Sequence, residues 1–75
     1  MRIKIKEARE HFKEVNGYTL TIDRLSELVE CYKMTLVKMN TKVSHPDLLL
    51  VAKICYICGV ITEDKKPDFN EIIEL

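Results

Sequence analysis

Apolar and charged positions along the first part of the chain have the spacing of an amphipathic helix. Apolar side chains recur three or four positions apart, at Ile5, Ala8, Phe12 and Val15. Asn16-Gly17 follows, and glycine tolerates the left-handed backbone on which many helices end. The pattern therefore predicts a helix over 5–15 that turns these apolar side chains inward.

A second helix is expected after a short loop. Thr21 carries a hydroxyl that can accept a hydrogen bond from an unpaired amide of a first helical turn. An apolar stripe follows it, at Leu25, Leu28 and Val29. Together these signals predict a helix over 22–29.

A third short helix is predicted over 33–40, with Leu36 and Met39 facing inward. A tight turn must separate it from the second. Glycine is the usual residue in such a turn, whereas this chain has Glu30. A left-handed backbone at a residue other than glycine costs on the order of 1 kcal/mol, which a folded domain can tolerate.

The stretch VSHPDLLLVAKICYICG gives the strongest helix signal. Pro46 suits a first helical turn and Asp47 suits its positive end, while His45 is expected to cap it and Gly59 to close it. The prediction is a helix over 46–58, apolar nearly all round, which is typical of a central helix or of one shared with a partner.

A last helix is predicted over 67–74, starting at Pro67-Asp68 and turning three apolar side chains inward, at Phe69, Ile72 and Ile73. The segment VIT at 60–62 is too short to predict a strand. The 75 residues, with only two glycines and two prolines, indicate one all-α domain of five helices. No run is long enough to span a membrane. The first residues lack an apolar signal core, so a cytoplasmic location is expected.

Net charge is zero, but its distribution is uneven. Residues 1–42 hold nine Lys or Arg against six Asp or Glu, whereas residues 43–75 hold three against six. One half could face a phosphate backbone while the other is turned away from it. A solvated surface without any partner explains the same asymmetry nearly as well.

The order of elements and several motifs resemble the lambda-repressor-like, Cro-type helix-turn-helix domains of phage and bacterial regulators. KEARE falls in the first helix, DRLSELV in the second and KMTLVKM in the third. Small Ser26 falls where the two helices cross closely, and Gly59-Val60 matches the end of the fourth helix. The resemblance covers roughly 60 positions and implies a compact five-helix fold.

That resemblance implies a sequence-specific transcriptional regulator that lays helix 33–40 in the major groove of double-stranded DNA. Carried over by position, the DNA-contacting residues are Ile22, Lys33, Met34, Thr35, Val37, Lys38, Thr41 and Lys42. Base discrimination relies on Arg, Lys, Asn, Gln and acidic side chains, yet three of these eight residues are apolar. An alternative is therefore a protein-interaction module on the same fold, with an apolar helix 33–40 docking a partner protein.

Four residues of helix 46–58 are apolar at positions that the family usually leaves polar: Leu49, Leu50, Tyr56 and Ile57. Surplus apolar surface on a small domain often marks an interface, so a homodimer through these residues is expected. Coverage by the first helix or by the last residues of the chain is the alternative.

Other chemistry is weakly signalled. Cys55 and Cys58 form a CxxC, which can be half of a zinc site or a redox pair, but both fall at apolar helix positions where cysteine behaves as a small hydrophobe. His11 is expected to be solvated on a charged helix face. With no catalytic arrangement or phosphate-binding glycine loop, we expect neither an enzyme nor a metal, cofactor or small-molecule substrate.

Overall fold

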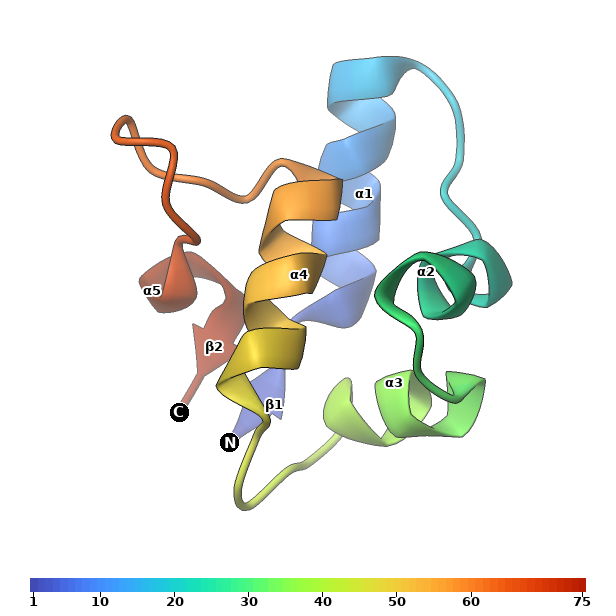
Figure 1. Cartoon of the computed structure of the whole chain (residues 1–75), viewed down its shortest axis with the longest axis vertical. Coiled ribbons are helices and arrows are strands. Elements are labelled where there is room, and N and C mark those ends of the chain that lie inside the picture. The colour runs from blue at the N-terminus through green and yellow to red at the C-terminus, as the bar shows by residue number, and fades with distance from the viewer.

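Five helices and two short strands make up the chain, which a computed structural model describes over residues 1–75 (Figure 1). In chain order they are β1 (Arg2–Ile3), α1 (Ile5–Asn16), α2 (Ile22–Val29), α3 (Lys33–Met39), α4 (Leu48–Cys58), α5 (Phe69–Ile72) and β2 (Ile73–Glu74).

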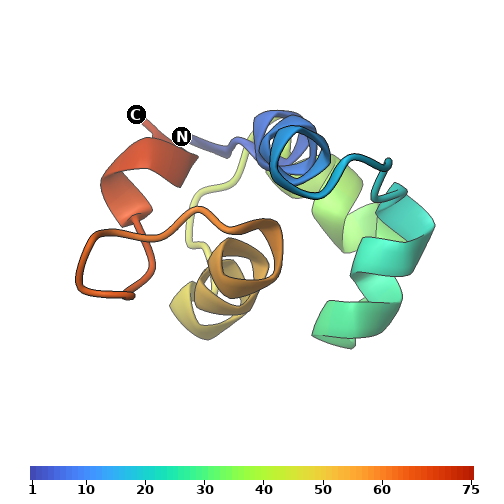
Figure 2. The ribbon, with the colours of Figure 1, turned by 90° about the horizontal axis from the view of Figure 1, so that it is seen from above.

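Helix α4 lies at the centre and packs against α1. Helices α2 and α3 lie on one side of this pair, and α5 with the strands lies on the other (Figures 1 and 2). The core draws on every element except β2, and its fully buried side chains include Ile3, Ile5, Leu25, Leu36, Val51, Ile54 and Ile72. None of the helices combines the length and the apolar character that a membrane crossing requires.

Helix α1 ends as expected, because Gly17 adopts a left-handed backbone with φ 80°. The prediction that Val15 faces inward was wrong, since its side chain is 65% exposed. The last turn of α1 extends beyond α2 and α4, so its side chains have no helix to pack against (Figure 1). Phe12 is the last buried side chain of α1, and Tyr18 meets its ring edge-on with centroids 5.2 Å apart.

Helix α2 has the predicted bounds, and the Thr21 hydroxyl accepts from the Arg24 amide at 3.1 Å. Residues 30–32 form the turn to α3. Glu30 is left-handed with φ 57° and ψ 48°, and its amide donates to the Glu27 carbonyl at 3.2 Å. Glu30 thus ends α2 in the conformation that glycine would adopt with less strain.

Helix α4 begins two residues later than predicted. The Asp47 side chain accepts from the amides of Leu49 and Leu50 at 3.0 and 3.3 Å. Asp47 is therefore the cap, and a capping residue lies outside the first turn. The expectations that Pro46 opens the helix and that His45 caps it were both wrong.

A small antiparallel sheet corrects the all-α prediction. Strand β2 pairs with β1 in the register Arg2↔Glu74 and Ile3↔Ile73, and it shortens the last helix to four residues. The backbone of Ile73 is extended, so it pairs with Ile3 of β1 and does not continue the helix. The protein is therefore mostly helical with a two-stranded sheet. Between α4 and α5, Ile61 forms an isolated bridge with Pro67.

Candidate nucleic-acid interface

Helix α3 is held to the domain by two side chains. Leu36 and Met39 are buried, as their spacing predicted. The other five residues of the helix face solvent: Lys33, Met34, Thr35, Val37 and Lys38. The outward surface of α3 therefore has the composition expected from the sequence, with two lysines, one hydroxyl and two apolar side chains.

Between Glu30, at the end of α2, and Asp47, at the start of α4, every charged side chain is basic. Residues 31–46 contain Lys33, Lys38 and Lys42 and no Asp or Glu. Lys38 and Lys42 form no ion pair, whereas the Lys33 ammonium lies 3.1 Å from an Asp23 carboxylate oxygen at the start of α2. Lys38 and Lys42 are consequently the cations of this surface that are free to meet an anion.

The hydroxyls of the predicted set differ in availability. Thr35 makes no side-chain hydrogen bond, but the Thr41 hydroxyl donates to the Lys38 carbonyl at 2.9 Å. A hydroxyl has a single proton, so Thr41 could donate to phosphate only by breaking that bond. Thr35 is therefore the stronger hydroxyl donor on this surface.

The apolar members of the set also differ. Met34 is 58% exposed and Val37 is exposed beside it on α3. Ile22 is half-buried and packs against the core, so the expectation that it faces outward was wrong. Ile22 is the first residue of α2, and its side chain contacts the core at that end of the helix.

The predicted dimer residues of α4 divide into two pairs. Leu49 and Tyr56 are exposed, by 78% and 56%. Leu50 and Ile57 are half-buried and pack against the core. The expectation of four solvent-facing apolar side chains was thus wrong for the second pair, because the packing partners of α4 cover part of its surface.

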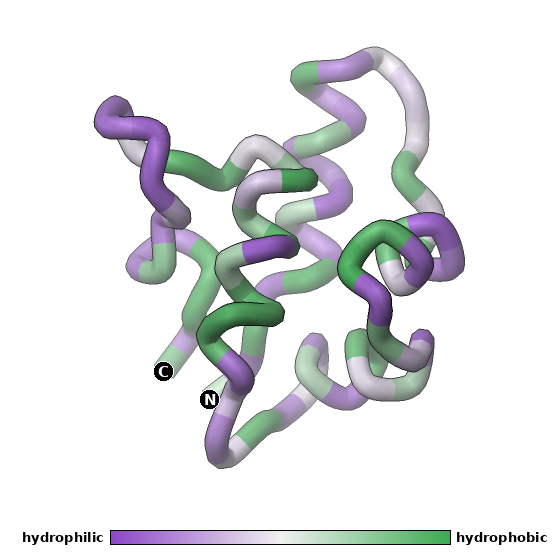
Figure 3. The backbone as a smooth tube through the Cα atoms, viewed as in Figure 1, coloured by the Kyte–Doolittle hydropathy of each residue, from purple (hydrophilic) through white to green (hydrophobic).

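A groove of about 490 Å³ lies between α4 and the end of α2, and we call it the α2–α4 groove. Residues from α4 and from the end of α2 line it. Figure 3 shows that the start of α4 and the end of α2 both include hydrophobic stretches. Its apolar wall comprises Val29, Cys31, Leu49, Leu50, Ala52 and Tyr56. The sequence pattern marked part of the α4 side as surplus apolar surface but did not show that the turn after α2 completes a groove.

No family model, curated protein or solved structure matches this chain. The surfaces of the chain itself therefore carry the functional argument.

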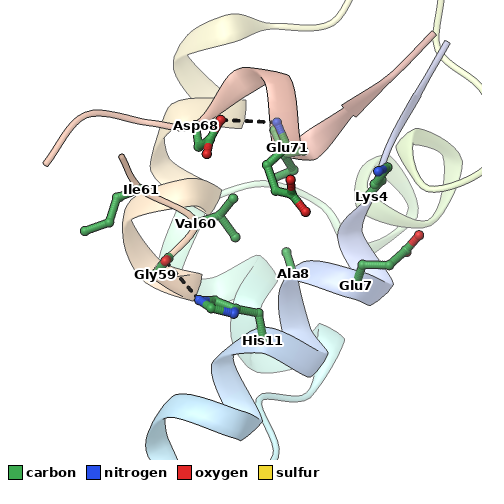
Figure 4. Close-up of a pocket in the computed structure, with 10 residues that line it drawn as sticks. Lys4, Glu7, Ala8, His11, Gly59, Val60, Ile61, Asp68 and Glu71 are labelled. Carbon is green, nitrogen blue, oxygen red and sulfur yellow. Dashed lines mark hydrogen bonds between the residues drawn. The ribbon is translucent and has the colours of Figure 1, made fainter. Parts of the chain in front are cut away.

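A second hollow, of about 320 Å³, lies where α1, the end of α4 and α5 meet (Figure 4). His11 lines it, half-buried, with Nε2 at 3.1 Å from the Gly59 carbonyl oxygen, so the expectation of a solvated histidine was wrong. Glu7 is held by Arg2 at 2.8 Å, and Asp68 accepts from the Glu71 amide as the cap of α5. These three polar groups already serve the fold.

The two cysteines of the CxxC are both buried in the core, as the apolar reading of their positions predicted. Burial raises the pKa of Cys55 to about 11 and that of Cys58 to about 12. At neutral pH both remain thiols, whereas metal binding and disulfide exchange require thiolates. No group of three or more His, Cys, Asp or Glu side chains could hold a metal ion.

One residue at the end of α3 was not singled out from the sequence. The Asn40 side chain accepts from the Lys6 amide at 3.0 Å, and its backbone carbonyl accepts from Arg2 Nε at 2.8 Å. Arg2 also donates to Glu7 and Glu74, and its hydrogen bonds to Glu7 lower the pKa of that carboxyl. Asn40 and Arg2 therefore fix the end of α3 against β1 and α1. The alternating stretch RIKIK was the available signal for the strand.

Proposed function

We propose that the protein is a sequence-specific DNA-binding transcriptional regulator with a lambda-repressor-like helix-turn-helix domain, in which α3 enters the major groove. The observation that carries this proposal is the charge of residues 31–46, where all three charged side chains are lysines. A solvent-facing helix anchored by two buried residues leaves its outer surface free for a duplex. Helices of this diameter fit the major groove.

The contacts give each residue a role in this proposal. Lys38 and Lys42, which have no ion pair, neutralise phosphates. Thr35 donates to phosphate or to a base edge, and Met34 and Val37 contact thymine methyl groups. Lys33 is shared between DNA and Asp23, so it contributes less than the other two lysines.

The test is binding of a fluorescent mixed-sequence duplex over a series of salt concentrations. Affinity should fall steeply as salt rises, and Lys38→Ala should reduce the slope of log K against log salt by about 1. Lys66→Ala is the matched control, because Lys66 is an exposed lysine in the loop between α4 and α5. Its slope should equal that of the unmodified protein.

The ion pair of Lys33 sharpens the same experiment. Asp23→Asn removes the competing carboxylate and frees the ammonium, so DNA affinity should rise several-fold at low salt. Lys33→Ala should weaken binding less than Lys38→Ala does. Equal losses for the two alanine variants would show that the ion pair has no influence on this surface.

A second candidate function is docking of a partner protein on α3. The exposure of Met34, an unbranched and adaptable side chain, favours it. No detectable binding to mixed duplex DNA at low salt would exclude the regulator and leave this candidate.

A further inference from the structure

The hollow between α1, α4 and α5 contains two oppositely charged side chains that belong to no ion pair of the protein. Lys4 lies just before α1, and Glu71 lies on α5. The charge of Lys4 also acts on Glu7, but that carboxylate already accepts two hydrogen bonds from Arg2. Asp68 is occupied as the cap of α5. One ammonium and one carboxylate of the hollow are therefore free to bind a ligand.

The backbone holds these two groups near each other, although they lie close to opposite ends of the chain. The Lys4 amide donates to the Ile72 carbonyl at 2.8 Å, which places Lys4 beside the residue that follows Glu71. The Glu71 carboxylate points into the hollow, whereas Glu7 points away from it (Figure 4). The pair is therefore preorganised, and a ligand does not have to order either segment of backbone.

The rest of the hollow is largely apolar. Ala8 and Val60 point into it (Figure 4), and both are buried, as is Ile72. His11 closes one end through its contact with the Gly59 carbonyl. The volume of about 320 Å³ lies at the low end of the range of about 300–1,000 Å³ in which small-molecule sites fall. The occupant is consequently small, and part of it is apolar.

We propose that this hollow binds a free α-amino acid with an aliphatic side chain. Such a zwitterion carries an ammonium and a carboxylate on one carbon, next to an apolar group. Its ammonium pairs with Glu71, its carboxylate pairs with Lys4, and its side chain lies on Ala8 and Val60. Hydrogen bonds between two charged groups are stronger than neutral ones. A ligand with only one of the two charges leaves either Glu71 or Lys4 without a partner, so it binds more weakly.

This site is separate from the surface proposed for DNA. Helix α5 and the strands lie on one side of the pair of α1 and α4, and α3 lies on the other (Figures 1 and 2). No small-molecule substrate was expected from the sequence, because Lys4 and Glu71 come together only when the ends of the chain pair as β1 and β2. The inference does not rest on the proposed function, and the measurements that test it contain no DNA.

The first test is a titration of the unmodified protein with L-leucine, followed by two-dimensional amide NMR. Leucine should bind with a dissociation constant of about 1 mM. The amide signals of Lys4, Val60 and Glu71 should shift, and those of α3 should not. Isopentylamine lacks the carboxylate of leucine and isocaproate lacks its ammonium, so each should bind about tenfold more weakly than leucine.

Two variants that remove one charge each test the pairing. Glu71→Gln should weaken leucine about tenfold and leave isocaproate unchanged, because isocaproate has no ammonium. Lys4→Met should weaken leucine by a similar factor and leave isopentylamine unchanged. Glu63→Gln and Lys66→Met are the matched controls, since both residues are exposed between α4 and α5 and neither lines the hollow. Thermal unfolding checks that every variant remains folded.

Three results would overturn the proposal. The first is the absence of any shift at the hollow with leucine up to about 20 mM, well above the expected dissociation constant. The second is isopentylamine that binds as tightly as leucine, which would make the hollow a site for cations alone. The third is a Glu71→Gln variant that binds leucine as tightly as Glu63→Gln does, which would place the ammonium elsewhere.

Discussion

Helices α4 and α3 differ in how many of their residues the core buries and in how their first turns are capped. Helix α4 buries four of its eleven residues and contacts α1, α2 and α5. Helix α3 buries only Leu36 and Met39 among its seven. The first is capped by Asp47, whereas the residue before the second, Tyr32, makes no capping hydrogen bond with its side chain.

The difference shows where function can vary without cost to the fold. Most substitutions on the buried face of α4 change the core, while those on the outer face of α3 change only what the domain presents to a partner. Free thiols, core side chains and helix caps each provide a way to measure this contrast.

The largest contrast is expected in thiol reactivity. Cys31, in the turn before α3, is half-buried, whereas Cys55 and Cys58 of α4 are fully buried. Their raised pKa values, about 11 and about 12, keep the thiolate fraction low until the pH approaches those values. Burial also raises the pKa of Cys31, but its side chain is only half-buried. Alkylation at pH 8 should therefore modify Cys31 first and the other two roughly a thousandfold more slowly, because unfolding must expose them.

Mass spectrometry of the alkylated protein measures this rate difference for each cysteine. In denaturant all three thiols should be alkylated at the same rate, because none is then buried. This measurement serves as the control. Rapid modification of two or three cysteines in native buffer would contradict the buried positions in α4.

A smaller contrast is expected from truncation of one side chain in each helix. Ile54→Ala in α4 should lower the free energy of unfolding by about 3 kcal/mol, because it leaves a cavity in the core. Val37→Ala on the outer face of α3 should change it by less than about 0.5 kcal/mol. Urea unfolding followed by circular dichroism measures both values.

Ile54→Val is the control for Ile54→Ala, and it should cost about 1 kcal/mol because only one methylene is lost. A loss at Val37 as large as that at Ile54 would show that α3 contributes more to the core than its exposure indicates.

The smallest contrast concerns the helix caps. Asp47→Ala removes two hydrogen bonds to the first amides of α4 and should cost about 1 kcal/mol. Tyr32 has an extended backbone, with φ −71° and ψ 141°, as a capping residue requires. Tyr32→Ser should therefore supply the missing cap of α3 and stabilise the protein by about 0.5 kcal/mol.

Thermal unfolding measures both stability changes, and the midpoint should fall for Asp47→Ala and rise for Tyr32→Ser. Because Tyr32 is almost fully exposed, little packing is lost on its replacement. A fall in stability for Tyr32→Ser would mean that the tyrosine ring makes contacts worth more than a cap.

Most of the helices could be predicted because their signals are local. Thr21 caps α2, Gly17 ends α1, and the spacing of Leu36 and Met39 places them in the core. The outward residues of α3 were expected from the resemblance to helix-turn-helix domains, which carried them over by position. Val15 and Ile22 were misplaced because helical spacing gives the face of a helix but not how far the core extends along it.

The sequence by itself determined the number of helices, their approximate bounds and, for α1 and α3, most of the side chains that are buried. These depend on hydrophobic periodicity and on capping groups within a few residues. The tertiary structure decided the sheet of β1 with β2, the ion pair of Lys33 with Asp23 and the groove between α2 and α4. Each of these joins segments from different elements, so it depends on how the helices pack. Even the alternating stretch RIKIK signals a strand without indicating its partner.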